Sequence, residues 1–315
     1  MSHTLLEPAA ERLFPHFLDP VDGTACVSAS STPVEIAATC SPVGLRFPLF
    51  LDPTASLSEH IHAATHTPAS CRFGPYCDNI LGMNWRCPNG TLVRVGEQVA
   101  KTTTGYDWLR FLLHSGNRFG SPVDYVLRLR PECGQTQAAI LEGTPETLEA
   151  CLREFIHSGW MHWWDSVDFL TENNRFRLRV LYHTVPEEIP IYTHRISEIA
   201  SGRQVSVTSA PLAEGTWDGI PDLVLKTTPD RTLPLARRIA KEGHRCVALW
   251  YSGVVHAYFK GLRDPASQAL ALGTALAPEL ESDGGDWHSK HLPAPPPRAS
   301  EREWIKILQE ALETP

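Results

Sequence analysis

The sequence lacks a long apolar run and an excess of basic residues. No stretch approaches the ~18 consecutive apolar residues of a membrane-spanning helix. The start, Met-Ser-His-Thr-Leu-Leu-Glu-Pro, has neither the basic residues nor the apolar stretch of a signal peptide. Lysine and arginine number 28 against 36 aspartates and glutamates, so the net charge is -8 and argues against binding to a nucleic-acid backbone. These absences predict a cytoplasmic protein with no membrane span and no nucleic-acid partner.

Several short motifs are also missing. The eight cysteines are scattered, and none forms a Cys-x-x-Cys pair, so a zinc ribbon, a thioredoxin-like site and an iron-sulfur ligand run are unsupported. The expected role of these cysteines is that of buried, reduced thiols. There is no Gly-x-Ser-x-Gly elbow, no P-loop and no Gly-x-Gly-x-x-Gly fingerprint.

What is present is a globular composition over 315 residues, with 42% hydrophobic and 20% charged residues, enough for about two domains. We expect a boundary near residue 133. Beyond it, a strand-helix-strand-strand order occurs twice, which predicts one antiparallel sheet with helices on one face. The expected organisation is a first domain over 1–133, a second over 134–282, a Pro/Gly-rich linker over 283–299 and an amphipathic C-terminal helix over 300–315.

Three clusters of side chains each allow two interpretations. The histidines at helical spacing are a metal-site candidate or exposed polar residues: His60, His62 and His66. The arginines that alternate with apolar residues on one strand could meet a carboxylate substrate or form a solvated outer face: Arg175, Arg177 and Arg179. The tryptophans grouped around His162 could stack on a ligand or pack in the second domain: Trp160, Trp163 and Trp164.

The most informative stretch runs from Asp78 to Pro131. It contains Asp-Asn-Ile-Leu-Gly, an Asn-Gly hairpin, Val-Gly-Glu, a lysine before Gly-Tyr-Asp, a helix, and a turn from Ser115 to Gly120 that leads into a strand ending in Arg-Pro. Glycines at such turns let the backbone approach a flat or anionic ligand closely.

The order and spacing of these elements resemble the FAD-binding domain of the vanillyl-alcohol-oxidase (p-cresol-methylhydroxylase-type, PCMH-type) superfamily, with the glycolate oxidase FAD-binding smaller subunit as the nearest likeness. The resemblance implies an α+β fold, in which a truncated PCMH-type FAD-binding subdomain precedes a ferredoxin-like cap domain. It also implies FAD as cofactor. The residues that it places near FAD are Gly82, Gly96, Lys101, Gly105, Tyr106, Asp107, Ser115 and Gly120.

The sequence also departs from the family pattern. The family's first FAD subdomain has no counterpart before the first expected strand. Glu59 stands where the family has a glycine, His114 and Asn117 alter the glycine turn, and Pro122 removes an amide donor. We therefore expect either of two functions.

In the first, the chain is the FAD-binding subunit of a 2-hydroxy-acid oxidoreductase with flavin and iron-sulfur partner subunits. In the second, it is a flavin-free scaffold or regulator of a flavin-containing partner. No general base is assigned; His183, His194 and His256 are candidates because family active sites often have a cap-domain histidine, and ordinary strand or loop roles are the alternative.

Overall fold

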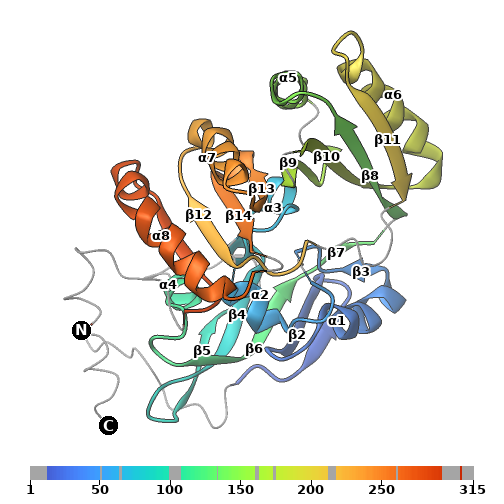
Figure 1. Cartoon of the computed structure of the whole chain (residues 1–315). Helices are drawn as coiled ribbons and strands as arrows, with labels where there is room; N and C mark the ends of the chain where they lie inside the picture. The colour runs from blue at the N-terminus through green and yellow to red at the C-terminus, as the bar shows by residue number, and fades with distance from the viewer. Residues whose placement is uncertain are drawn as a thin grey trace. The chain divides into compact units, whose positions relative to one another are not determined.

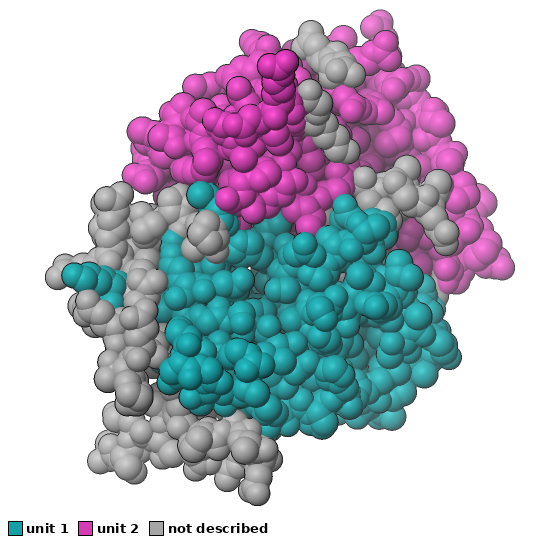
Figure 2. All heavy atoms as spheres, turned by 60° about the horizontal axis from the view of Figure 1, so that its bottom comes forward, with its two compact units in different colours: residues 1–65, 75–132, 292–315 teal, residues 66–74, 133–291 magenta. Residues whose placement is uncertain are grey.

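The computed structural model describes residues 13–49, 52–63, 66–98, 108–132, 134–159, 163–172, 175–211, 218–259, 262–292 and 306. The chain divides into two compact units, coloured separately in Figure 2. Unit 1 comprises residues 1–65, 75–132 and 292–315, and unit 2 comprises residues 66–74 and 133–291. The chain passes from unit 1 to unit 2 between residues 132 and 133, and residues 66–74 also belong to unit 2, a crossing that no local sequence signal indicated.

Unit 1 is built on an antiparallel sheet of five strands among the described residues, in the order β1-β2-β6-β4-β5 (Figure 1). The strands are β1 (Phe17–Asp19), β2 (Thr24–Ser28), β4 (Ile80–Arg86), β5 (Leu92–Gly96) and β6 (Ser121–Arg128). A separate ribbon pairs β3 (Leu45–Arg46) with β7 (Arg130–Pro131). The helical segments are α1 (Pro33–Cys40), η1 (Ser41–Val43), α2 (Leu57–Ala63), η2 (Tyr76–Asp78) and α4 (Trp108–His114).

Local sequence signals account for much of unit 1. Helix α1 begins at a capping box, in which the Thr32 side chain accepts from the Glu35 amide and the Glu35 carboxylate accepts from the Thr32 amide. The turn after it ends at Gly44, whose φ of 70° is the left-handed conformation that glycine favours. The predicted hairpin is confirmed: β4 and β5 pair across the Pro88–Gly90 turn.

Unit 2 is built on an eight-stranded antiparallel sheet in the described chain, in the order β11-β8-β10-β9-β13-β14-β12-β15. Its strands are β8 (Gln135–Glu142), β9 (Ser166–Glu172), β10 (Arg175–Thr184), β11 (Ser206–Pro211), β12 (Leu223–Lys226), β13 (Arg245–Leu249), β14 (Val254–Tyr258) and β15 (Asp286–Ser289). Its helical segments are α3 (Ser70–Phe73), α5 (Pro145–His157), η4 (Pro186–Glu188), α6 (Ile189–Ala200), α7 (Pro229–Lys241), η5 (Trp250–Ser252) and α8 (Pro265–Ser282).

The unit 2 sheet is made of two ferredoxin-like repeats. The first runs β8-α5-β9-β10-α6-β11 and the second β12-α7-β13-β14-α8-β15, each in strand-helix-strand-strand-helix-strand order. They join edge to edge because β9 and β13, the second strand of each repeat, pair antiparallel. The sheet that the sequence predicted from two repeated units is therefore confirmed.

The first helices of the repeats, α5 and α7, share a sequence pattern. Each has a threonine at its N-cap followed by proline, at Thr144-Pro145 and at Thr228-Pro229. The same positions of both helices are buried: Leu148, Cys151, Leu152 and Phe155 of α5 correspond to Thr232, Leu235, Ala236 and Ile239 of α7. Both helices therefore place the same face on the sheet.

The sequence missed the second half of each repeat. Helices α6 and α8 and strands β11 and β15 were not predicted, and β15 lies inside the expected linker 283–299. Strand β15 is the four-residue stretch Asp-Trp-His-Ser, and what holds it in the sheet is pairing with β12 and packing of Trp287 on Gly273 of α8. Most of the expected C-terminal helix lies outside the described residues. No described helix is long and apolar enough to cross a membrane.

Side chains of unit 2 alternate between two faces of its sheet. On β9, Val167 and Phe169 join the core beneath helices α5 to α8, whereas Ser166 and Asp168 point to the opposite face. We call this opposite side, which helices α5 to α8 leave uncovered, the helix-free face. The short helix α3, from the segment 66–74, lies against β9.

Candidate functional site

Two of the predicted FAD contacts face each other across the β4–β5 hairpin. Gly82 and Gly96 are cross-strand partners. A Cβ on Gly82 would lie 2.9 Å from the Phe14 ring and from the Glu97 carbonyl oxygen. A Cβ on Gly96, which has a φ of 80°, would overlap the Leu81 carbonyl and lie 2.7 Å from the Gly82 Cα. The space that these glycines leave is filled by the hairpin and by Phe14, so their role in the structure is close packing.

The turn between α4 and β6 is packed in the same way. The Ser115 hydroxyl donates to the Leu112 carbonyl at 2.7 Å and closes the end of α4. A Cβ on Gly120 would overlap the Arg86 carbonyl and lie 2.6 Å from Nε1 of Trp85, which donates to the Phe119 carbonyl at 2.9 Å. Gly120 therefore lets the turn approach β4.

The other four predicted contacts, Lys101, Gly105, Tyr106 and Asp107, lie outside the described residues. Within the described part of unit 1, the chain's own atoms occupy the place where a side chain would begin at Gly82, Gly96 and Gly120. These residues position the hairpin and turn that flank the segment 99–107.

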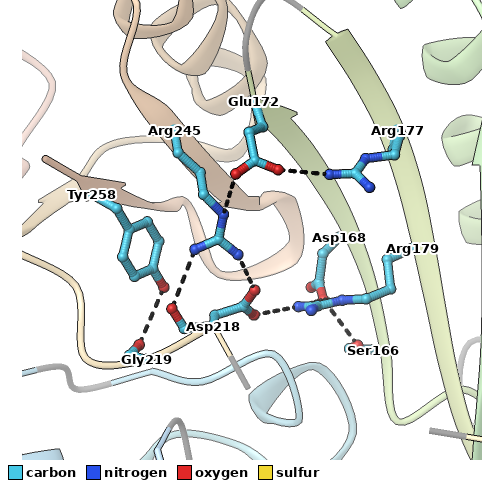
Figure 3. Close-up of polar contacts among 9 residues, drawn as sticks. All are labelled: Ser166, Asp168, Glu172, Arg177, Arg179, Asp218, Gly219, Arg245 and Tyr258. Carbon is cyan, nitrogen blue, oxygen red and sulfur yellow. Dashed lines mark hydrogen bonds and ion pairs between the residues drawn. The ribbon is translucent and has the colours of Figure 1, made fainter. Parts of the chain in front are cut away.

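A set of interacting charges lies on the helix-free face of unit 2 (Figure 3). We call it the charge cluster, and its members are Ser166, Asp168, Glu172, Arg177, Arg179, Asp218, Gly219, Arg245 and Tyr258. The β9, β10, β13 and β14 strands supply all of them except Asp218 and Gly219, which come from the connection between the two repeats. The cluster therefore joins side chains of both ferredoxin-like repeats.

Arg179 lies at the centre of the charge cluster and is 7% exposed. Its guanidinium donates to Asp168, its cross-strand partner, at 3.0 Å and to Asp218 at 2.6 Å. Burial raises the pKa of Asp168 to about 6 despite the Arg179 charge. Burial would raise the pKa of Asp218 as well, but Arg179 and Arg245 lower it below its usual value. Asp168 is thus the acid of this pair that takes up a proton first as pH falls.

Arg245 ties the second repeat to the same acid. One of its amino groups donates to the Asp218 carboxylate at 2.5 Å, and the other donates to the Asp218 carbonyl at 3.2 Å. The guanidinium stacks over the ring of Tyr258, its cross-strand partner, at 4.5 Å. The Tyr258 hydroxyl donates to the Gly219 carbonyl at 3.4 Å. Asp218 and Gly219 are therefore held by side chains of β10, β13 and β14.

The segment 66–74 contributes to the same face. Arg72 of α3 forms an ion pair with Asp165 at 2.7 Å. Cys71 lies close enough to Asp168 for that charge to act on it, although burial is the main reason that the pKa of this thiol rises to about 12. His256 of β14 is fully buried beside His66, and burial lowers its pKa to about 4. Such a histidine is neutral at pH 7.

The structure places the candidate histidines apart from one another. His256 lies on the helix-free face, His183 contacts Thr136 at the β8–β10 pair, and His194 lies exposed on α6 beside Glu198. In the metal-site candidate, both ring nitrogens of His60 are hydrogen-bonded, Nε2 accepting from Asp52 and Nδ1 donating to Ser56. Neither nitrogen of His60 is left for a metal, and the described residues hold no cluster of metal-ligating side chains.

The arginine and tryptophan sets turn out differently from each other. A solvated outer face is wrong for Arg179, which is buried and forms ion pairs with Asp168 and Asp218. Packing is confirmed for two tryptophans: Trp164 is fully buried against Phe155 and Tyr182, and Trp163 packs on Tyr192. Trp160 and His162 lie outside the described residues.

Sequence reasoning missed Asp168, Asp218, Arg245 and Tyr258. One signal was present, because Asp168 interrupts the apolar Val167–Leu170 run at the position where the neighbouring strand carries Arg179. A charged pair facing each other within two apolar strands indicates a buried ion pair. Asp218 had no such signal, since it belongs to no helix or strand.

The opposite pKa shifts of Asp168 and His256 predict opposite pH effects. A carboxyl with a raised pKa stabilises the folded state most below pH 3.8, and that contribution is lost as pH rises through about 6. A histidine with a lowered pKa contributes stability above pH 6.5, and this is lost as pH falls through about 4. Between pH 4 and 6, the parent chain loses the Asp168 contribution to stability as pH rises, and Asp168→Asn should remove that loss. Over the same range it gains the His256 contribution, and His256→Gln should remove that gain.

These pH effects are measured as the stability of each variant minus that of the parent chain at each pH, using urea unfolding. The subtraction cancels the remaining titrating groups. Difference profiles that are flat for both variants, or that slope in the same direction, contradict the assignment.

Comparison with known proteins now adds to this geometry. The chain matches no family model. It is 30% identical over 87 residues to the mitochondrial D-lactate dehydrogenase [cytochrome] of Arabidopsis thaliana, which covers 28% of this chain and 15% of that protein. It is 24% identical over 118 residues to an uncharacterized FAD-linked oxidoreductase of Mycobacterium tuberculosis, covering 36% of this chain and 25% of that protein. Each match therefore spans a minor part of the relative.

Solved structures resemble nearly the whole chain. An alkyldihydroxyacetonephosphate synthase superposes with a TM-score of 0.61 at 10% identity, covering 96% of this chain and 64% of that one. The VAO-type flavoprotein of Myceliophthora thermophila C1 superposes with a TM-score of 0.62 at 12% identity, covering 96% of this chain and 67% of that one.

The chain has a VAO-type flavoprotein fold. This finding confirms the expected α+β class and, with the FAD-linked relatives, the resemblance to the VAO/PCMH-type superfamily. The two units of this VAO-type fold correspond to about two thirds of the length of the solved structures.

Proposed function

We propose that this chain is part of an FAD-linked oxidoreductase, with unit 1 contributing to the flavin site and unit 2 acting as the substrate cap. The observation that carries the proposal is the VAO-type fold over 96% of the chain. The FAD-linked relatives, matched over short stretches, support it. FAD, when bound, supplies the redox chemistry as hydride acceptor, and the protein supplies orientation and electrostatics.

The four predicted contacts outside the described residues are our proposed flavin contacts: Lys101, Gly105, Tyr106 and Asp107. The described members of the predicted set act on this segment from either side. Gly82 and Gly96 allow the β4–β5 hairpin to close before it, while Ser115 and Gly120 shape the turn after α4. Their role in our proposal is to hold the segment in place.

We further propose a 2-hydroxy acid as substrate and other oxidoreductase subunits, of flavin and iron-sulfur type, as partners. The D-lactate dehydrogenase relative supports the substrate class, since lactate is a 2-hydroxy acid. The likeness of the stretch Asp78 to Pro131 to the glycolate oxidase smaller subunit supports both. Catalysis would then belong to the assembled complex.

The purified chain tests this proposal through its absorption spectrum. Flavin absorption bands, with FAD released on denaturation, are the expected result. Lys101→Met should weaken the binding of added FAD, and Arg94→Met is the matched control because the contacts of Arg94, with Glu97 and the Phe14 ring, lie outside the segment 99–107. A colourless chain that binds no added FAD, alone or with its partners, contradicts the proposal.

A flavin-free scaffold or regulator is the second candidate function. Two observations favour it: the space beside Gly82, Gly96 and Gly120 is filled by the chain's own atoms, and Arg179 is bound to two aspartates of the same chain. Co-purification of a colourless chain with a flavin-containing subunit is the result that this alternative expects.

A further inference from the structure

The carboxylate of Asp218 is held by one arginine from each ferredoxin-like repeat. Arg179 of β10 donates to Oδ2 at 2.6 Å, and Arg245 of β13 donates to Oδ1 at 2.5 Å. Asp218 itself belongs to no strand or helix and is 6% exposed. The two guanidinium groups therefore form a fork, which we call the Arg179–Arg245 fork, with one carboxylate oxygen on each side (Figure 3).

Both arginines have other contacts that hold them in place. The Arg179 guanidinium also donates to Asp168, through Nε at 3.3 Å and Nη2 at 3.0 Å. Arg245 stacks on the Tyr258 ring and lies 4.0 Å from Glu172. These contacts come from strands of the sheet and do not involve Asp218. A preformed pair of cations that converge on one point is an anion site.

Charge balance indicates that the fork needs one anion. Without Asp218, the cluster contains the cations Arg177, Arg179 and Arg245 against the anions Asp168 and Glu172, which leaves one positive charge in excess. Leaving a buried charge uncompensated is costly. With Asp218 the cluster is neutral, so a single carboxylate satisfies the fork.

We propose that the Arg179–Arg245 fork is a binding site for a small carboxylate, and that Asp218 occupies it as an internal ligand of the free chain. A carboxylate from outside binds by replacing the Asp218 side chain between the two guanidinium groups. The Arg245 and Tyr258 donors to the carbonyls of Asp218 and Gly219 then hold the emptied segment nearby. This proposal goes beyond the proposed function and needs no flavin.

The experiment removes Asp218 and supplies its carboxylate in solution. Asp218→Ala deletes the side-chain carboxylate, and the full chain is unfolded by heat at pH 7.5 in sodium acetate, which supplies a carboxylate, or in sodium chloride of equal ionic strength. We expect 0.1 M acetate to raise the melting temperature of Asp218→Ala by about 3 °C or more over chloride. Acetamide, which has the same shape and no charge, should not.

The matched control is Asp165→Ala. Asp165 is as buried as Asp218, and it forms an ion pair with Arg72 of α3, which lies outside the Arg179–Arg245 fork. Acetate should not stabilise this variant over chloride, and at 0.1 M it should stabilise the parent chain much less than Asp218→Ala, because the tethered Asp218 carboxylate competes for the fork. Where Asp218→Ala is unfolded in chloride, acetate is expected to restore its far-ultraviolet circular dichroism.

Three results would overturn the proposal. The first is an Asp218→Ala chain that gains no stability or structure in acetate beyond chloride. The second is equal stabilisation of the parent chain, which means that acetate acts elsewhere. The third is equal rescue of Asp165→Ala, which means that the Arg179–Arg245 fork is not required. A missing flavin spectrum changes none of these outcomes, so failure of the proposed function is recognised separately.

Discussion

Arg179→Met should lower the free energy of unfolding of unit 2 by about 3–5 kcal/mol, the usual cost of removing one partner from a buried ion pair. Asp168 and Asp218 both lose their shared cation, and both are nearly fully buried. Hydrogen exchange of the β9 and β10 peptides measures the effect locally, and peptides of unit 1 serve as the internal reference.

Arg177→Met is the matched control for this substitution. Arg177 lies on the same strand and the same face, but its pair with Glu172 is partly exposed on both sides, so we expect a cost within about 1 kcal/mol. The two variants differ chiefly in burial of the lost charge. Equal costs for both would show that the buried position of Arg179 does not determine its contribution.

Gly120→Ala should destabilise unit 1 by about 3 kcal/mol or more. The new Cβ would overlap the Arg86 carbonyl and lie 2.6 Å from Nε1 of Trp85, and the φ of 123° is itself unfavourable for alanine. Because the Arg86 carbonyl belongs to the backbone, it cannot move away as a flexible side chain could. Hydrogen exchange of the β4 and β6 peptides measures the loss.

Gly90→Ala separates backbone strain from lack of space. Gly90 has a φ of 85°, but no atom lies within 4 Å of the place that an alanine Cβ would take, so only the strain of about 1–2 kcal/mol applies. Both experiments use the flavin-free chain. If Gly120→Ala unfolds no more easily than Gly90→Ala, Gly120 is not required for packing of the turn. Contact with a ligand would then be the better explanation for this glycine.

Local signals in the sequence were sufficient for several elements. The capping box at Thr32, the Asn-Gly turn of the β4–β5 hairpin and the Thr-Pro start of α5 each depend on residues within a few positions of one another. The strand-helix-strand-strand order of both repeats was visible for the same reason. Helix α6 and strands β11 and β15 were not, because their places depend on distant partners.

The candidate site shows the same division. The glycines were recognised from the spacing of Asp78 to Pro131, but the sequence could not tell whether a cofactor or the protein fills the space beside them. For Gly82, Gly96 and Gly120 the nearest atoms belong to the chain itself. The alternation of Arg175, Arg177 and Arg179 likewise defined a face of a strand without showing which of them is buried.

By itself, the sequence determined the strand-helix-strand-strand repeat in unit 2 through local motifs and periodicity. Its motifs from Asp78 to Pro131 gave the superfamily resemblance, which in turn implied the class of fold. Only the tertiary structure decided that residues 66–74 join unit 2, that β9 and β13 connect the repeats, and that Asp218 lies between Arg179 and Arg245. The physical reason is that burial and ion pairing depend on groups far apart in the chain, which approach one another only when both repeats have closed into one sheet.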